Sequence, residues 1–155
     1  MAPTSTFALP APYRLFFLTI EPLSALVGAF YACLKPQTYL YLTQHLSAHP
    51  SPSDDTTHLP LATRIVLTQL ANLYLLFALH EALVLRATSD LRVWRTVLAL
   101  LLVADLGHLA SVAPLGSSIY WNLARWNPID WGNVGFVYVG AAMRLAFLAG
   151  VGMKR

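Results

Sequence analysis

The chain has 155 residues, of which 57% are hydrophobic and only 11% are charged, and its formal net charge is +3. Soluble domains carry about 25% charged residues, so this composition excludes an ordinary soluble protein and indicates a membrane protein. The basic residues form no long face with interleaved aromatic side chains, and we therefore expect no nucleic-acid partner.

Four stretches are apolar over about 20 residues, the length that a helix needs to cross a bilayer. They predict an all-α, four-helix transmembrane bundle that forms one integral membrane domain over residues 1–155, with membrane lipids as its neighbours. In chain order, the predicted spans are residues 13–34, 61–85, 93–113 and 133–152.

The basic residues also predict the orientation of the chain, because Lys and Arg are enriched on the cytoplasmic side of a membrane. In a four-span protein, the N-terminus, the second loop and the C-terminus share one side. The Lys and Arg residues of that side outnumber those of the other side. We therefore expect both termini in the cytoplasm, with the endoplasmic reticulum as the membrane. The first side carries Arg14, Arg86, Arg92, Arg95, Lys154 and Arg155, and the other carries Lys35, Arg64 and Arg125.

The first loop, residues 35–60, mixes Ser, Pro, Asp and His at a density typical of a solvated linker. Its histidines, His45, His49 and His58, include one pair at the helical spacing that zinc sites use. Two prolines follow that pair and no helical pattern surrounds it, so we expect a solvated loop. The chain has a single cysteine, Cys33, and no glycine-rich phosphate loop. We therefore expect no metal and no cofactor.

Each predicted span carries at least one ionisable residue within its apolar run, where a charge is costly unless it is paired or used. These residues are Glu21, Glu81, Asp105 with His108, and Arg144. At the helical rise, the four charged residues lie roughly 12, 6, 18 and 11 Å from the cytoplasmic ends of their spans. Asp105 and His108 lie in the middle of the run VLALLLVADLGHLASVA, which is otherwise almost entirely apolar.

Helical periodicity predicts which of these side chains face the interior of the bundle. The second span has two polar faces: Asn72 and His80 share one, whereas Glu81 and Tyr74 share the opposite one. Ionisable or polar side chains of all four spans can nevertheless point to one interior. This expected interior set is Glu21, Asn72 or His80, Asp105 with His108, and Arg144.

The four spans together carry more carboxyls than arginines within their apolar runs, namely Glu21, Glu81 and Asp105 against Arg144. Intramembrane polar residues often act only as interhelical hydrogen bonds, worth about 0.6 kcal/mol each, and one Glu–Arg pair would be structural. Three carboxyls against one arginine leave acids unpaired, and an unpaired carboxyl in a low dielectric stays neutral. A neutral acid beside an ionised one is what general acid/base chemistry requires. We therefore expect a functional cavity, with purely structural packing as the alternative.

The third loop is rich in aromatic residues, including Trp126 and Trp131, which is typical of a belt at the membrane interface. Pro128 predicts a turn, and Asp130 is well placed to cap the fourth helix. The loop could also form a luminal lid over the cavity. The residues that we expect to contact a substrate are Asn72, Tyr74, His80, Trp126, Asp130, Trp131 and Asn133.

Several short motifs in combination resemble a family of small fungal four-span membrane proteins, and the resemblance covers nearly the whole chain. It implies an epoxide hydrolase or an epoxide-opening cyclase that acts on polyene pyrones made by polyketide synthases and flavin monooxygenases, within secondary metabolism. The architecture alone is also similar to four-helix sterol isomerases and their sterol-binding relatives. The motifs are YR (13–14), IEP (20–22), QLANLY (69–74), HEA (80–82), DLRVWR (90–95), ADLGH (104–108), WN (126–127) and DWGN (130–133).

Opening an epoxide requires an acid that protonates the departing oxygen and a base that activates water or a substrate hydroxyl. We expect Asp105 to be the base, tuned by His108 and Asn72. Glu21 is the expected acid, and Arg144 would hold the geometry. A lipophilic small-molecule substrate would reach these residues from the bilayer.

Some alternatives remain open at this stage. Glu81 could substitute for either the base, Asp105, or the acid, Glu21. The same polar interior would also suit a nonenzymatic sterol- or lipid-binding protein, a membrane partner subunit, or an isomerase that shifts a double bond by protonation and deprotonation. Small residues of the first and fourth spans suggest a surface for a homodimer, namely Ala25, Ala29, Gly135 and Gly140.

Overall fold

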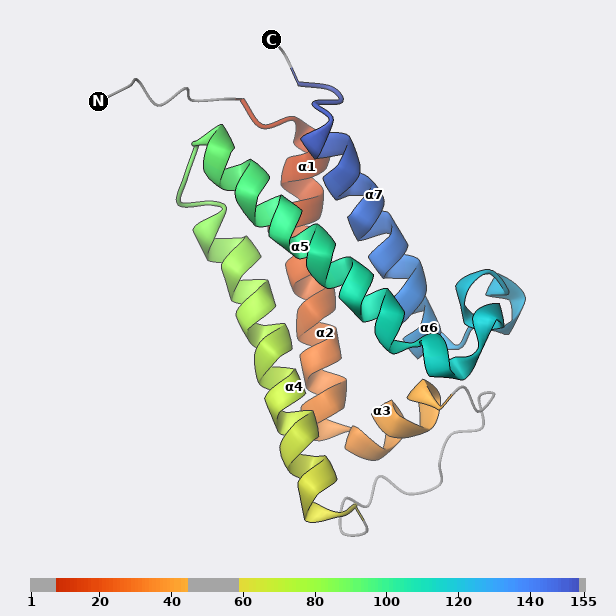
Figure 1. Ribbon diagram of the computed structural model, residues 1–155. Coiled ribbons are helices and arrows are strands. Elements are labelled where there is room, and N and C mark those ends of the chain that lie inside the picture. Colours follow the sequence, from red (N-terminus) through yellow and green to blue (C-terminus); the bar gives the residue numbers. More distant parts are fainter. Residues whose placement is uncertain (1–7, 45–58, 154–155) are drawn as a thin grey trace.

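The computed structural model describes residues 8–44 and 59–153, and all of the elements in these residues are helices (Figure 1). The first span is interrupted by a wider, π-helical segment, and the second ends in one. The first consists of α1 (Ala11–Leu15), the π-helix η1 (Phe16–Ile20) and α2 (Glu21–Leu34), and the second of α4 (Leu61–Leu79) and the π-helix η3 (His80–Val84).

The second half of the chain contains two further spans joined by a loop with short 3-10 turns. The third span is α5 (Leu91–Ser111), which continues into η4 (Ala113–Leu115). The first half of the chain also contains a short helix between its two spans, α3 (Pro36–Thr43). The loop turns are η5 (Ser117–Tyr120) and η6 (Leu123–Arg125), and the fourth span consists of α6 (Pro128–Asp130), the π-helix η7 (Trp131–Phe136) and α7 (Val137–Leu148).

Four helices are long and apolar enough to cross a membrane, which confirms the predicted all-α four-helix bundle and fits an integral membrane protein. The first three agree with the predicted spans within two residues at each end. The fourth begins earlier, at Pro128, and ends earlier, at Leu148. The four helices are Ala11–Leu34, Leu61–Val84, Leu91–Leu115 and Pro128–Leu148.

Local backbone chemistry explains both ends of the fourth span. The side chain of Asn127 accepts hydrogen bonds from the backbone N–H groups of Ile129 and Asp130, so the helix starts directly after Asn127. At the other end, Gly150 adopts a left-handed conformation with φ +78°. Its N–H donates to the Phe147 carbonyl and that of Val151 to the Ala146 carbonyl, the pattern that closes a helix around a glycine.

The four spans pack as two pairs, α2 along α4 and α5 along α7. The start of α1 and the end of α7 lie at one end of the bundle, and α3 lies at the other (Figure 1). The Tyr13 hydroxyl donates to the Val151 carbonyl at 2.9 Å and so joins the first span to the segment after the last one. α5 crosses the bundle obliquely in this view.

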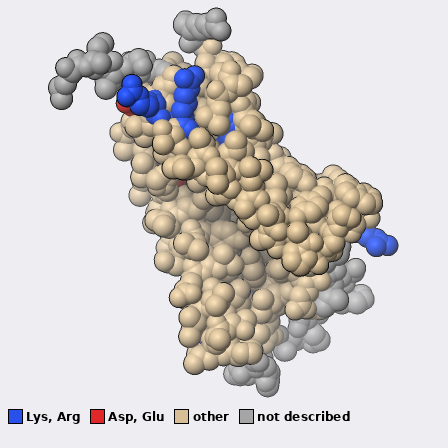
Figure 2. All heavy atoms as spheres, in the orientation of Figure 1, with Lys and Arg blue, Asp and Glu red and all other residues tan. Residues whose placement is uncertain are grey.

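The side chains divide into an inner apolar core and an outer apolar surface. Phe17, Trp94, Leu98 and Phe147 are buried at the end where the chain begins and ends. Figure 2 shows that the visible outer surface carries few charged side chains away from that end. Such a surface suits a bilayer, because exposed apolar area of this extent is unusual in water. It includes Leu15, Leu23, Val27, Leu73, Leu83, Leu100 and Val103, all more than half exposed.

Pro22 explains why the first span widens at η1. A proline lacks the N–H that would bond the carbonyl four residues earlier, here that of Leu18, and its ring crowds the preceding turn. The guanidinium of Arg86, just beyond the second span, donates to the Leu18 carbonyl instead. The first two spans are thus joined at the carbonyl whose partner four residues later is a proline.

Candidate functional site

Arg144 of α7 is fully buried and contacts carboxyl groups from each of the other three spans. Its Nη2 donates to Glu21 Oε1 at 2.6 Å and lies 3.4 Å from Glu81 Oε1, and its Nη1 donates to Asp105 Oδ2 at 2.8 Å. We call these four residues the carboxyl–arginine cluster. The interior positions predicted for Glu21, Asp105 and Arg144 are confirmed, and Glu81 joins them.

The two glutamates of the cluster are the only ones in the sequence, and each is placed by a π-helical segment. Glu21 follows η1 directly, and Glu81 is the second residue of η3. The segments η1 and η3 pack against each other. π-helical segments inside α-helices occur frequently at functional sites, because they redirect side chains from the regular helical face.

Two phenylalanines that the sequence analysis missed cover the guanidinium of Arg144. Its Cζ lies 5.8 Å from the ring centroid of Phe17 and 6.0 Å from that of Phe77, distances at which a cation is attracted to an aromatic face. Each phenylalanine precedes a cluster glutamate by four residues and shares its face. The pattern F-x-x-x-E, which occurs at both places, is the signal that could have found them.

Gly140 has no side chain, and the Arg144 guanidinium occupies the space where one would lie. It lies four residues before Arg144 on α7, and a Cβ atom there would be 2.6 Å from Arg144 Nη1 and 3.1 Å from Glu21 Oε1. The first distance is shorter than any ordinary contact. A side chain at this position would therefore displace the arginine from its carboxyl partners.

We expect Gly140→Ala to lower the stability of the protein by about 1–3 kcal/mol, the usual effect of an extra methyl group in a packed interior. Gly107→Ala is the matched control, because its new methyl group would have no neighbour within 4 Å in the described part of the chain. Thermal unfolding in detergent measures the difference. Equal melting temperatures for the two variants would contradict the close approach at Gly140.

The charge of the cluster does not balance if every group is ionised. One guanidinium faces three carboxyls, and Arg144 and Glu81 are 0% exposed, Glu21 5% and Asp105 8%. Because buried unpaired charges are strongly unfavourable, such a cluster holds protons. Glu21 Oε1 and Glu81 Oε1 lie 2.6 and 3.4 Å from the same nitrogen, Arg144 Nη2, so the two carboxyls are close neighbours. Two carboxyls can share a hydrogen bond only when one is protonated, so the glutamate pair is the place for a proton.

Asn72 does not face the cluster, and the prediction that it points to the interior is wrong. Its side chain is exposed on the outer face of α4, whereas Glu81, on the opposite face, is buried. The reason is energetic, because an amide costs less to expose to lipid than a carboxylate. His80 is partly buried, on a different face from Glu81. Asn72 is therefore in no position to tune Asp105.

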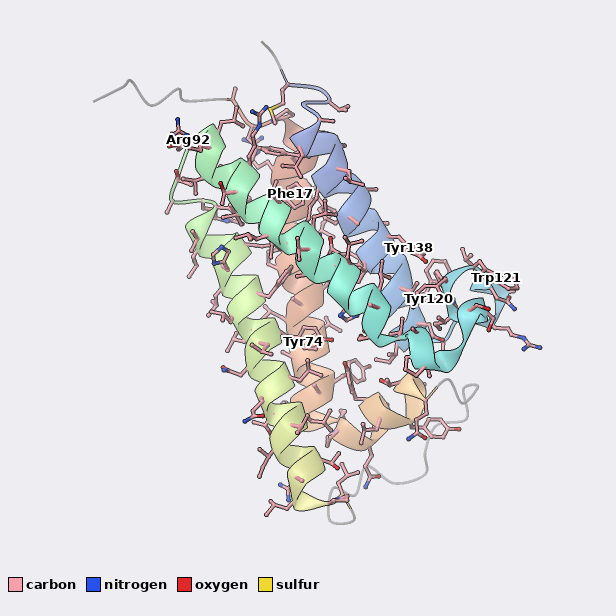
Figure 3. The ribbon with its side chains drawn as sticks, viewed as in Figure 1. Phe17, Tyr74, Arg92, Tyr120, Trp121 and Tyr138 are labelled. Carbon is pink, nitrogen blue, oxygen red and sulfur yellow. The ribbon has the colours of Figure 1, made fainter. Side chains whose placement is uncertain are left out.

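His108 and Tyr74 are not part of the carboxyl–arginine cluster. His108 is partly buried, and its Nε2 is buried without a hydrogen-bond partner in the described part of the chain, so this nitrogen makes no bond to Asp105. The Tyr74 hydroxyl lies 3.1 Å from the Tyr39 hydroxyl of α3, in the half of the bundle that Figure 3 shows away from Phe17. These residues lie between the cluster and the end of the bundle that carries α3.

The third loop does not cover the cluster, so the lid expectation is wrong. Asp130 precedes Arg144 by 14 residues, about 20 Å of helix. Figure 3 likewise shows Tyr120 and Trp121 at the outer edge of the molecule, distant from Phe17. The Trp126 and Trp131 rings pack edge to face at 4.9 Å, and Trp131 is 51% exposed. This position fits an aromatic belt at the membrane interface.

Asp130 takes part in a helix cap, although not as its first residue. Asn127 is the capping residue of α6, and the Asp130 side chain accepts in return from the Asn127 N–H at 2.9 Å, which completes a reciprocal capping box. The Asn127 amide also donates to the Leu42 carbonyl at 2.8 Å. This cap fastens the fourth span to the end of α3.

The small residues that suggested a homodimer surface are used within one chain. Ala25 and Gly140 are buried, and Ala29 packs against the core that joins α2, α3 and α4. A Cβ at Gly135 would meet the Trp131 and Trp126 rings at 2.9 and 3.0 Å. Two of the four positions are therefore buried within one chain, and Ala29 and Gly135 are partly exposed.

The histidines of the first loop, His45, His49 and His58, lie outside the described residues. No curated protein and no solved structure matches the chain. Residues 6–154 match the family described as domain of unknown function DUF7704. Because the match extends over nearly the whole sequence, the four-span protein with the carboxyl–arginine cluster belongs to the DUF7704 family.

Proposed function

We propose that the protein is a membrane-embedded enzyme that opens an epoxide of a lipophilic, polyketide-type substrate by acid/base catalysis, as a hydrolase or a cyclase. The observation that carries the proposal is the contact of three carboxyls with one buried arginine. This arrangement supplies a proton donor and a proton acceptor side by side without a metal.

The roles follow from burial, because the most exposed carboxyl is the one that water or a substrate can reach. Asp105, the least buried of the four and 2.8 Å from Nη1, is the ionised base. The glutamate pair holds the proton, and Glu21 delivers it to the epoxide oxygen as the carbon–oxygen bond breaks. Glu81 shares that proton and is thus a regular member of the site rather than a substitute for another acid.

The reaction balances within the cluster. Water, or a hydroxyl of the substrate in a cyclase, attacks the epoxide carbon and gives its proton to Asp105. Transfer of that proton from Asp105 back to the glutamate pair restores the starting state. Arg144 stays charged next to all three carboxyls, so a carboxylate is stabilised wherever it forms.

The alternative functions use the same residues differently. The complete burial of Arg144 and Glu81 favours a sterol- or lipid-binding protein or a membrane partner subunit, in which the cluster only fixes the helices. A double-bond isomerase would use the glutamate pair as the acid and Asp105 as the base. In the proposed enzyme, the substrate enters from the bilayer and reaches Asp105 by displacing the side chains that lie between them.

The cellular setting is part of the proposal. An excess of Lys and Arg on the side of the termini supports a cytoplasmic location of both ends. We place the protein in the endoplasmic reticulum of a fungus, where lipophilic intermediates of secondary metabolism would be dissolved in the same membrane. This setting is consistent with the resemblance to fungal four-span proteins described above.

The test is turnover of a polyene epoxide by the purified protein in phospholipid nanodiscs, with products identified by mass spectrometry in heavy-oxygen water. We expect a diol that carries one heavy oxygen from a hydrolase, or a cyclic ether without it from a cyclase. A Glu21→Gln/Glu81→Gln double variant is the inactive control, because it cannot donate the proton. Absence of product from the wild type together with tight sterol binding would reject the enzyme in favour of the binding protein, and a shifted double bond would identify the isomerase.

A further inference from the structure

A groove with a volume of about 710 Å³ lies on the outside of the bundle, and no residue of the carboxyl–arginine cluster lines it. It runs along the first turns of the first span and reaches Arg86 at the end of the second. Its walls combine apolar side chains, such as Leu15 and Leu18, with the two basic residues Arg14 and Arg86.

The groove has the two-part chemistry of an amphiphilic ligand. Arg14 belongs to the first turn of the span that starts at Ala11, and Arg86 follows the span that ends at Val84, so both lie at the level of lipid headgroups. Leu15, which is 57% exposed, continues the groove toward the membrane interior. Figure 2 shows Lys and Arg gathered at the end of the molecule that carries both termini.

The position of Arg86 is fixed before any ligand binds. Its guanidinium donates to the Leu18 carbonyl, which cannot accept from the N–H-lacking Pro22 four residues later, and its other N–H groups remain for an anion. A preorganised guanidinium binds phosphate oxygens at a lower entropic cost than a freely rotating one. A second cavity, of about 210 Å³, adjoins Leu18 and Arg86 and adds the hydroxyl-bearing residues Thr88 and Ser89.

We infer that this groove binds an anionic membrane phospholipid, with its phosphate between Arg14 and Arg86 and an acyl chain along Leu15 and Leu18. The two cationic side chains match the charge of the headgroup, and the apolar wall at hydrocarbon depth matches the chain. A free anion would use only the rim. The inference does not depend on the epoxide chemistry, because no cluster residue lines the groove.

Native mass spectrometry of the detergent-purified protein, titrated with phosphatidylglycerol, tests the inference. We expect one lipid to bind and Arg14→Gln to weaken its binding about fivefold, because a basic residue near the headgroups is worth about that factor. Arg86→Lys, which keeps a charge and a donor for the Leu18 carbonyl, should have a smaller effect. Arg125→Gln is the matched control, because Arg125 is exposed in the third loop at the opposite end of the bundle.

The same titration with phosphatidylcholine and with inorganic phosphate separates the other ligands. Equal binding of phosphatidylcholine, or displacement of the lipid by millimolar inorganic phosphate, would overturn the assignment to an anionic phospholipid. Equal losses in Arg14→Gln and Arg125→Gln would show that only overall charge matters. Unchanged melting temperatures of the variants would confirm that the loss of lipid is a loss of the site.

Discussion

Arg144→Ala is expected to reduce the yield of folded protein severely and to lower its stability by about 3–5 kcal/mol. The variant removes the group that Glu21, Glu81 and Asp105 share and leaves buried carboxyls without a cation. Because a whole domain is stable by only about 5–15 kcal/mol, this loss is a large fraction of the total. Thermal unfolding and size-exclusion profiles in detergent would measure it.

The control is Arg95→Ala, an exposed arginine in the first turns of α5, for which we expect almost no change. Glu21→Gln/Glu81→Gln in the Arg144→Ala background adds a second test, since neutral amides no longer need the cation. We expect this triple variant to recover part of the lost stability. If Arg144→Ala melts like the wild type, the cluster does not hold the four spans together.

Asp105→Asn is expected to lower turnover by about a hundredfold or more while the protein folds normally. In the wild type, Arg144 Nη1 lies 2.8 Å from Asp105 Oδ2. An asparagine keeps the size of the side chain and an oxygen that can accept this hydrogen bond. It cannot take a proton from water or from a substrate hydroxyl. Product formation from the polyene epoxide and the melting temperature are measured on the same preparation.

Asp90→Asn is the matched control for this variant. The Asp90 side chain caps α5 by accepting from the Arg92 N–H at 2.7 Å, a bond that asparagine can also make. Full activity of Asp105→Asn would remove the proposed mechanism. A fall in melting temperature as large as that of Arg144→Ala would instead identify Asp105 as a structural partner of the arginine.

The spans and three of the four cluster positions could be predicted from the sequence because a charge in an apolar run must find a partner. This cost, together with helical periodicity, assigns Glu21, Asp105 and Arg144 to the interior. For the second span, periodicity offered two polar faces and did not decide between Asn72 and Glu81. The cost of exposing a carboxylate to lipid decides it, and that argument was available from the sequence.

Residue counting predicts the depth of the backbone and not that of the side-chain ends. Asp105 and Arg144 were expected about 7 Å apart along the membrane normal, from the rise per residue, and the long Arg144 side chain brings its Nη1 to 2.8 Å from Asp105 Oδ2. Counting assumes upright helices, whereas α5 is inclined across the bundle (Figure 1). The lid failed for a related reason, since the fourth span starts at its capped turn and carries the loop away from the arginine.

The π-helical segments make the site sensitive to the number of residues in each span. Each residue of an α-helix turns the chain by about 100°, and the five residues of η1 set the angle at which Glu21 leaves the first span. Deleting one of the residues 16–20 would remove no residue of the cluster. It would, however, rotate the side chains that precede the deletion relative to those that follow it, including Glu21. In other members of the family, a glutamate aligned with Glu21 therefore implies the same site only where the spacing from Phe17 through Pro22 is also the same.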